Sequence, residues 1–175
     1  MWTLQMSGVT IEALDHELEK IFREHYRMVY RTAYGVTGNA ADAEDIVQTI
    51  FLRLLRRDVR PDLKNAKAYL YKAAVNLALS TVQATKRRIL IDDPEKLEAP
   101  ESGHASAEEI HQQLYEAVAQ LSPGAAEILI LRYVHNYSDA EIAKLLGTTR
   151  GTIAVSLYRS RSRLKKLMRP LGDMP

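Results

Sequence analysis

The sequence predicts an all-α chain in which two small helical domains are joined by an acidic linker. Three observations indicate this fold. Apolar residues recur at three- and four-residue spacing, and no segment shows the alternation that is typical of strands. Hydrophobic residues make up 46% of the 175 residues, which is enough to bury a core. The charges are grouped by segment, with a run of acids between two basic parts.

The first domain, residues 1–88, is predicted to be a three-helix bundle. Apolar residues at helical spacing indicate one helix from Glu12 to about Val36 and a second from Ala40 to Arg57, with Asn39 as its N-cap. A third helix is expected over Ala66–Arg88. The residues expected to be buried on this third helix are Tyr69, Leu70, Ala73, Ala74, Leu77, Ala78 and Val82.

The next segment, residues 89–106, is interpreted as an acidic linker. Residues 89–109 contain seven acids and a single basic residue, Lys96. Two prolines and a glycine fall within the linker, where apolar periodicity is weak. We therefore expect an irregular connection between the two domains.

The second domain, residues 107–175, carries strong helix-start signals. Ser106–Glu109 and Ser138–Glu141 both have the capping-box pattern, in which a serine and a glutamate satisfy each other's backbone amides. Ser122 followed by Pro123 is a further N-cap signal. The last helix is expected to begin after Thr149 and to end near Met168.

Residues 138–168 have the spacing of a helix-turn-helix, with small Ala143, turn-forming Gly147 and apolar Ile153 in sequence. In this motif the second helix enters the major groove of DNA and reads base edges. The candidates for base contact are Arg150, Thr152, Ala154, Val155, Ser156 and Arg159. The candidates for phosphate contact are Arg161, Arg163, Lys165 and Lys166. The alternative is an amphipathic terminal helix whose arginines only form a solvated face.

A second candidate surface for nucleic acid is a polar stripe along the third predicted helix. Its members recur at spacings of three and four and include no acid, and they are Lys72, Asn76, Ser80, Gln83 and Arg87. Amide side chains bind base edges and cationic ones bind phosphates, so the stripe is a candidate surface for nucleic acid. The alternative is an ordinary wet helix surface.

Several of these segments resemble one family. The run Asp42–Leu52, which reads Asp-Ala-Glu-Asp-Ile-Val-Gln-Thr-Ile-Phe-Leu, closely resembles the region 2 helix of bacterial sigma factors of the extracytoplasmic-function (ECF) group. Residues 68–78 resemble the promoter-reading segment of that family. Residues 121–133 and 141–153 resemble its region 4. Two different motifs at the family's separation make the resemblance specific.

The resemblance implies a non-catalytic specificity subunit of RNA polymerase. In the family, the helix with the Asp-Ala-Glu-Asp motif docks on the clamp coiled coil of the β′ subunit. The resemblance assigns core-polymerase binding here to Glu44, Asp45, Gln48 and Leu52. The alternative for these residues is a solvated helix start, where the helix dipole favours acids in any case.

The resemblance also implies two DNA elements. The stripe through Asn76 would read the −10 element partly as single strands, with the loop 58–67 helping to hold an extruded base, and region 4 would read the −35 element as duplex. The linker would thread toward the active-site and RNA-exit channels of the polymerase. The β subunit of the polymerase and an anti-sigma factor are further expected partners. Tyr69, Val75, Ser80, Gln83 and the run 154–156 depart from the usual family residues, and these departures are expected to lie on DNA-facing surfaces and not in the cores.

Other functional classes are less favoured by the sequence. A stand-alone helix-turn-helix regulator remains the alternative, and it would bind palindromic operators as a dimer without a polymerase. The chain has no cysteine, no His-x-x-x-His pair and no glycine-rich phosphate loop, so we expect no enzyme activity, metal, cofactor or small-molecule substrate. It also lacks an apolar run of membrane-spanning length and a signal-peptide pattern, so a cytoplasmic protein is expected, starting at Met1 or Met6.

Overall fold

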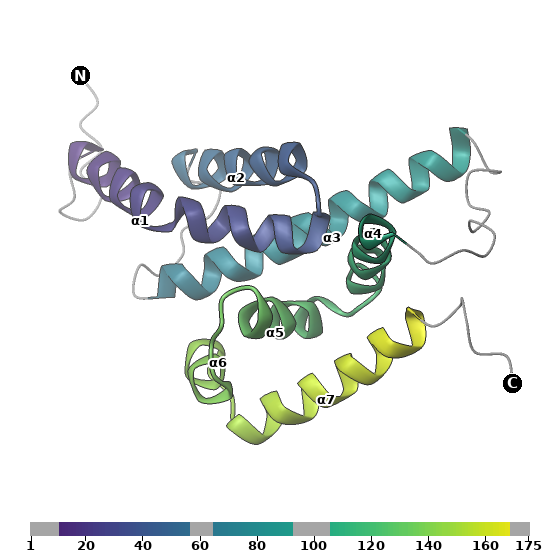
Figure 1. Cartoon of the computed structure of the whole chain (residues 1–175). Helices are drawn as coiled ribbons and strands as arrows, with labels where there is room; N and C mark the ends of the chain where they lie inside the picture. The colour runs from purple at the N-terminus through teal and green to yellow at the C-terminus, as the bar shows by residue number, and fades with distance from the viewer. Residues whose placement is uncertain (1–10, 57–64, 93–105, 169–175) are drawn as a thin grey trace, which may run out of the picture.

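The computed structural model describes residues 11–56, 65–92 and 106–168, and these residues contain seven helices and no strand (Figure 1). The predicted all-α class is therefore confirmed. The helices are α1 (Ile11–Thr37), α2 (Ala40–Leu55), α3 (Ala66–Asp92), α4 (Ala107–Val118), α5 (Pro123–Tyr133), α6 (Asp139–Leu146) and α7 (Arg150–Leu167). No helix within the described ranges is long and apolar enough to span a membrane.

Helices α1, α2 and α3 pack together as a three-helix bundle (Figure 1). Gly38 adopts a φ of 65°, a left-handed conformation that ends α1 and turns the chain into α2. The Asn39 side chain then accepts a hydrogen bond of 3.1 Å from the amide of Asp42, which caps α2 as predicted. The buried face of α2 consists of Ala43, Ile46, Val47, Ile50 and Leu54.

Helices α4 to α7 form the second unit, and local sequence signals account for most of its helix starts. Both predicted capping boxes are present, at Ser106 with Glu109 and at Ser138 with Glu141. Ser122 occupies the N-cap of α5 and Pro123 is the first residue of the helix, but the Ser122 side chain makes no capping hydrogen bond.

The two helical units also pack against each other. Helix α5 contacts α3 and α1, and α4 contacts the end of α1 (Figure 1). The buried apolar residues of both units form a single continuous cluster. The sequence predicted the two units but not this docking, because an amphipathic pattern shows that a helix has a buried face and not which distant helix covers it.

Helix α3 shows the effect of this docking on burial. Leu70, Ala74 and Ala78 are buried as predicted, but Tyr71, Val75 and Leu79 are buried as well. Four of the residues expected in the core are only partly buried, namely Tyr69, Ala73, Leu77 and Val82. The helix is therefore covered on a wider arc than its predicted stripe.

Helix α3 continues to Asp92, so the first four residues of the expected linker are helical. Residues 93–105 of that linker lie outside the described residues, and Ser106 is the N-cap of α4. Of the loop 58–67 that the family resemblance assigns to an extruded base, residues 58–64 lie outside the described residues too.

Candidate nucleic-acid interface

Helices α6 and α7 have the geometry of a helix-turn-helix. Ala143 is buried at the crossing of the two helices, Gly147 takes a φ of 65° in the turn, and Ile153 is fully buried between them. The Thr149 hydroxyl accepts a hydrogen bond of 3.2 Å from the amide of Thr152, which fixes the start of α7. The predicted roles of the small, turn and apolar positions therefore match the structure.

The capping box of α6 fixes the position of the first helix of this motif. The Glu141 carboxylate accepts a hydrogen bond of 2.8 Å from the Ser138 amide and one of 2.7 Å from the Ser138 hydroxyl. These two hydrogen bonds stabilise the charged carboxylate and lower the pKa of Glu141. The α6 start is thereby held by a charged cap at neutral pH.

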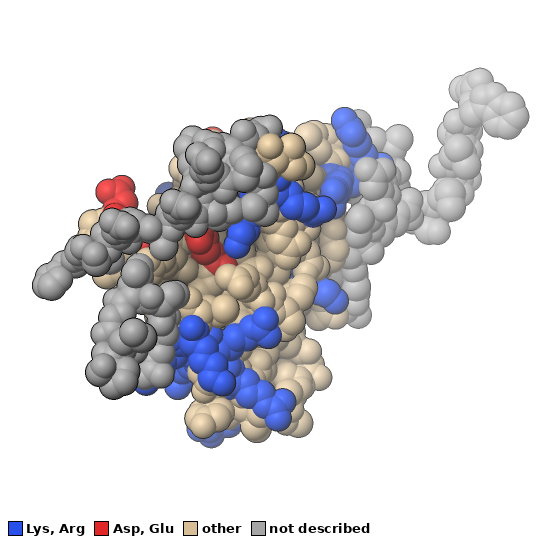
Figure 2. All heavy atoms as spheres, turned by 90° about the vertical axis from the view of Figure 1, so that its right-hand side faces the viewer, with Lys and Arg blue, Asp and Glu red and all other residues tan. Residues whose placement is uncertain are grey.

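Helix α7 presents its predicted DNA-reading residues to solvent. Arg150, Thr152, Ala154, Val155 and Arg159 are exposed, and Ser156 is half-buried. The four predicted phosphate-binding residues, Arg161, Arg163, Lys165 and Lys166, are exposed as well. Figure 2 shows Lys and Arg side chains gathered in the lower part of one face of the molecule, where α7 lies in Figure 1. This face is suited to a polyanion.

A groove of about 560 Å³ runs between α7 and the start of α5. Four of the predicted base-reading residues line it, namely Thr152, Val155, Ser156 and Arg159, together with the predicted phosphate contact Arg163. Arg150 and Ala154 are outside this groove. The structure therefore brings most, but not all, of the predicted −35 residues to one concave surface.

Two predicted contact residues already have partners within the protein. The Thr152 hydroxyl lies 2.9 Å from that of Thr149, and the Arg161 guanidinium lies 5.9 Å from the centre of the Tyr133 ring. Tyr158 is 72% exposed on α7, and sequence reasoning missed it. Its only sequence signal is its position one helical turn after Ala154, which places it on the same exposed face.

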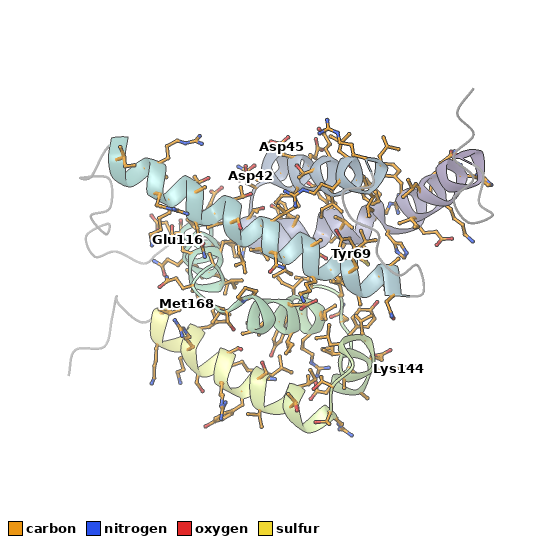
Figure 3. The ribbon with its side chains drawn as sticks, turned by 180° about the vertical axis from the view of Figure 1, so that it is seen from behind. Asp42, Asp45, Tyr69, Glu116, Lys144 and Met168 are labelled. Atoms are coloured by element: carbon orange, nitrogen blue, oxygen red, sulfur yellow. The ribbon has the colours of Figure 1, made fainter. Side chains whose placement is uncertain are left out.

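The polar stripe of α3 is exposed along its whole length, from Lys72 to Arg87. Lys72, Asn76 and Ser80 line a groove of about 380 Å³ between α2 and α3. Figure 3 shows Tyr69, which also lines this groove, on the N-terminal half of α3. Gln83 and Arg87 lie further along the helix, beyond the groove. An aromatic ring beside amide and cationic side chains is a suitable combination for unpaired bases.

The groove also differs from the predicted stripe. Arg53 on α2 lines it, and sequence reasoning missed this residue because the stripe was traced along one helix only. The Ser80 hydroxyl donates a hydrogen bond of 2.9 Å to the Asn76 carbonyl, so it is engaged within α3. Val75 departs from the usual family residue and was expected on a DNA-facing surface. Its side chain is only 1% exposed, so it belongs to the core.

The predicted polymerase-docking residues form the outer flank of α2. Glu44, Asp45, Gln48 and Leu52 are all exposed, and Leu52 is 46% exposed despite being apolar. Asp42 and Asp45 lie on α2 at the edge of the molecule furthest from α7 (Figure 3). Phe22 and Leu55, on the same bundle, are 41% and 56% exposed and add to the exposed apolar surface. The exposed acids and apolar residues make this flank a candidate protein-binding surface.

Comparisons with known proteins identify the family of this chain. Residues 21–88 match the family model of Sigma-70 region 2, and residues 111–164 match that of Sigma-70, region 4. The chain is 26% identical over 162 residues to the ECF RNA polymerase sigma factor SigL of Mycobacterium tuberculosis, covering 89% of this chain and 90% of SigL. It is 27% identical over 154 residues to the RNA polymerase sigma-E factor of Streptomyces antibioticus, covering 86% of this chain and 83% of that factor.

A solved structure has the same fold. The sigma factor RpoE, crystallised with the anti-sigma factor NepR from Bartonella quintana, superposes with a TM-score of 0.50 at 23% sequence identity. The superposition covers 93% of this chain and all of that one. The likeness thus extends over both helical units.

Proposed function

This chain belongs to the ECF group of bacterial RNA polymerase sigma factors, and from that premise we propose which surface binds the polymerase and which surfaces bind promoter DNA. Helix α2 binds the core polymerase, α3 reads the −10 element, and α7 reads the −35 element. The observation that carries the proposal is that two acid-free polar faces lie exposed on separate helices, each beside a groove. A regulator that reads an operator with a single motif would need only one such face.

We propose that α7 reads duplex DNA. Arg150 and Arg159 at its exposed side are suited to bidentate contacts with guanine, and the Ala154 and Val155 methyl groups are suited to thymine methyls. The basic residues from Arg161 to Lys166 would bind phosphates and orient the domain without reading sequence.

We propose that α3 captures single-stranded bases. Asn76 and Tyr69 share the groove between α2 and α3 with the cations Lys72 and Arg53. Base stacking on an aromatic ring and hydrogen bonds to an amide together offset the cost of unpairing, which is a few kcal/mol per extruded base. Promoter melting would then be driven by binding energy, with no covalent step on the protein.

We propose that the outer flank of α2 docks on the clamp coiled coil of the β′ subunit, with further contacts to the β subunit. The exposed carboxylates of Glu44 and Asp45 and the exposed apolar side chain of Leu52 support this assignment. An inhibitory anti-sigma protein is a further proposed partner, because the structural relative from Bartonella quintana was crystallised with one.

The docking proposal is tested by changing Asp45 and Gln48 together to alanine. Both side chains are exposed on α2 and contact neither groove, so folding and DNA affinity should be retained. We expect affinity for purified core polymerase to fall by at least tenfold, with a matching loss of promoter-directed transcription. The exposed α4 variant Gln112→Ala serves as a control.

The same experiment distinguishes the proposed sigma factor from a stand-alone regulator. That protein would need no polymerase and would bind a palindromic operator as a dimer. Unchanged activity of the Asp45→Ala/Gln48→Ala variant, or failure of the unmodified chain to bind core polymerase at micromolar concentration, would contradict the proposed function.

The DNA-reading proposal is tested by Arg150→Ala. If Arg150 pairs with guanine, its loss costs about 1–3 kcal/mol of discrimination at one base pair of the −35 element and leaves other positions unchanged. The measurement is transcription from a panel of promoters that differ singly in that element. Lys166→Ala is the matched control, because loss of a phosphate contact weakens all promoters equally. Equal weakening by Arg150→Ala would assign Arg150 to phosphate.

A further inference from the structure

The groove between the start of α5 and α7 has a charge pattern suited to an anion. Its charged lining residues are Arg159 and Arg163, and none of the described residues that line it is acidic. The first turn of α5, which borders the groove, contains no acid either. The positive end of the α5 dipole and two guanidinium groups therefore face one concave surface without a carboxylate to neutralise them.

The start of α5 also leaves hydrogen-bond donors free. The first backbone hydrogen bond of this helix runs from the Ala126 amide to the Ser122 carbonyl, at 2.9 Å, so the amides of Gly124 and Ala125 precede the helical ladder. Ser122 occupies the N-cap, but its side chain forms no capping hydrogen bond. A Cβ atom at Gly124 would meet no atom within 4 Å, so this turn is uncrowded. Two amides and one hydroxyl are thus available to a ligand.

A buried serine of α7 lies on the same groove. Ser160 is 4% exposed, lines the groove, and forms no hydrogen bond with another described residue. It shares the buried face of α7 with Ile153 and Leu157, where an apolar side chain would avoid the cost of burying a hydroxyl. A buried hydroxyl without a partner lowers stability, so its position here points to a polar ligand in the groove.

The place of the groove identifies the DNA backbone as this ligand. Four candidates for base contact, Thr152, Val155, Ser156 and Arg159, also line it, so a duplex read by α7 covers the groove. The major groove of DNA is about 12 Å wide, whereas the axes of two packed helices lie about 8–10 Å apart. A helix packed beside one that enters the major groove therefore lies over the sugar–phosphate wall. Helix α5 packs along α7 in this way (Figure 1).

We propose that the start of α5 and the Ser160 side chain bind one backbone phosphate of the −35 duplex. The hydroxyls of Ser122 and Ser160 and the amides of Gly124 and Ala125 donate hydrogen bonds to the phosphate oxygens, and Arg163 supplies the opposite charge. The inference rests on the proposed function, since it needs α7 to lie in the major groove. This phosphate site reads no base, and it fixes the angle at which α7 enters the duplex.

Removal of single phosphate charges tests the phosphate site. Each phosphate of the −35 element is replaced in turn by an uncharged methylphosphonate, and the affinity of the promoter for core polymerase carrying this chain is measured. The unmodified chain is compared with the variant Ser122→Ala/Ser160→Ala, which lacks both hydroxyls. Neither side chain forms a hydrogen bond with another described residue, so the variant should keep its fold and its affinity for the core polymerase.

We expect one methylphosphonate to weaken promoter binding of the unmodified chain about tenfold, and that of the double variant only about threefold, because the variant has already lost two donors to that phosphate. The other phosphates should give equal losses in both proteins. Identical profiles of the two proteins across the whole element overturn the phosphate site. Failure of the unmodified chain to bind the promoter with core polymerase would instead contradict the proposed function.

A second variant adds a charge without removing a cap. Ser122→Asp keeps a preferred N-cap residue at the start of α5, so the helix is retained, but its carboxylate repels a phosphate there. We expect promoter affinity to fall about tenfold on every −35 sequence, because a phosphate contact reads no base. Ser106→Asp is the matched control, since it makes the same change at the N-cap of α4, outside the groove. Equal promoter affinity of Ser122→Asp and Ser106→Asp would also overturn the phosphate site.

Discussion

At the scale of single residues, His135 shows how docking changes a side chain. Burial lowers the pKa of His135 to about 4, and the nearby charges of Arg31 and Lys67 act in the same direction. The other groups that face it are the hydroxyls of Thr32 and Tyr71 and the ring of Tyr137, none of which is charged at neutral pH. The imidazole is therefore neutral while the two units are docked.

The sign of the resulting pH dependence follows from linkage. An undocked His135 has an ordinary pKa near 6.5, so the undocked units take up a proton more readily than the docked ones. The contribution of neutral His135 to docking is fully present above about pH 6.5 and is lost as the pH falls toward 4. We expect acid to weaken the docking of the two helical units.

Nuclear magnetic resonance titration measures this directly. The His135 signals, assigned by their absence in His135→Gln, should titrate well below pH 6 in the unmodified chain. They should titrate closer to 6.5 in Gly35→Gln, whose new side chain meets Ile130 and Val134 and disturbs the docking of α5 on α1. An ordinary pKa for His135 in the unmodified chain would show that its ring is not buried against Tyr71.

At the scale of elements, two serines begin helices in different ways. Ser138 caps α6 with a hydrogen bond of 3.3 Å from the Glu141 amide, whereas Ser122 begins α5 without any side-chain capping bond. Ser138→Ala should therefore lower the free energy of unfolding by about 1 kcal/mol, and Ser122→Ala by less than about 0.5 kcal/mol. Urea denaturation of both variants measures the difference, and equal losses would contradict the assigned caps.

Sequence patterns predicted most helix boundaries because these are set locally. The caps at Asn39, Ser106 and Ser138 and the turn at Gly147 depend on residues three or four positions away. The exposed faces of α3 and α7 were predictable for the same reason, since three- and four-residue spacing fixes which side chains share a face.

Contacts between distant segments were not predictable in this way. Arg53 joins the α3 groove from α2, and Tyr71 is buried by residues 64 and 66 positions further along the chain, at His135 and Tyr137. Periodicity within α3 contains no information about these partners. Val75 shows the consequence, because it was expected on a DNA face and lies in the core.

At the scale of the whole molecule, the continuous core couples the two units. The C-terminal unit described here spans residues 106–168, and a domain of about 60 residues buries a smaller share of its surface than a larger one and is marginal alone. Docking on α1 and α3 adds buried apolar area at Ile130 and Tyr71. The stability of the C-terminal unit should therefore depend on its docking against α1 and α3.

This coupling predicts the shape of thermal unfolding. The unmodified chain should unfold in one transition near neutral pH, with a calorimetric enthalpy close to the van't Hoff enthalpy. Gly35→Gln should separate the units, because its side chain meets Ile130 and Val134 and leaves the core of α1 to α3 intact. We expect two transitions in that variant, with the C-terminal unit unfolding first, and one in the control Gly124→Gln. Two transitions in the unmodified chain would mean that docking is too weak to couple the unfolding of the two units, so calorimetry of the free protein tests the docked arrangement independently of polymerase and DNA.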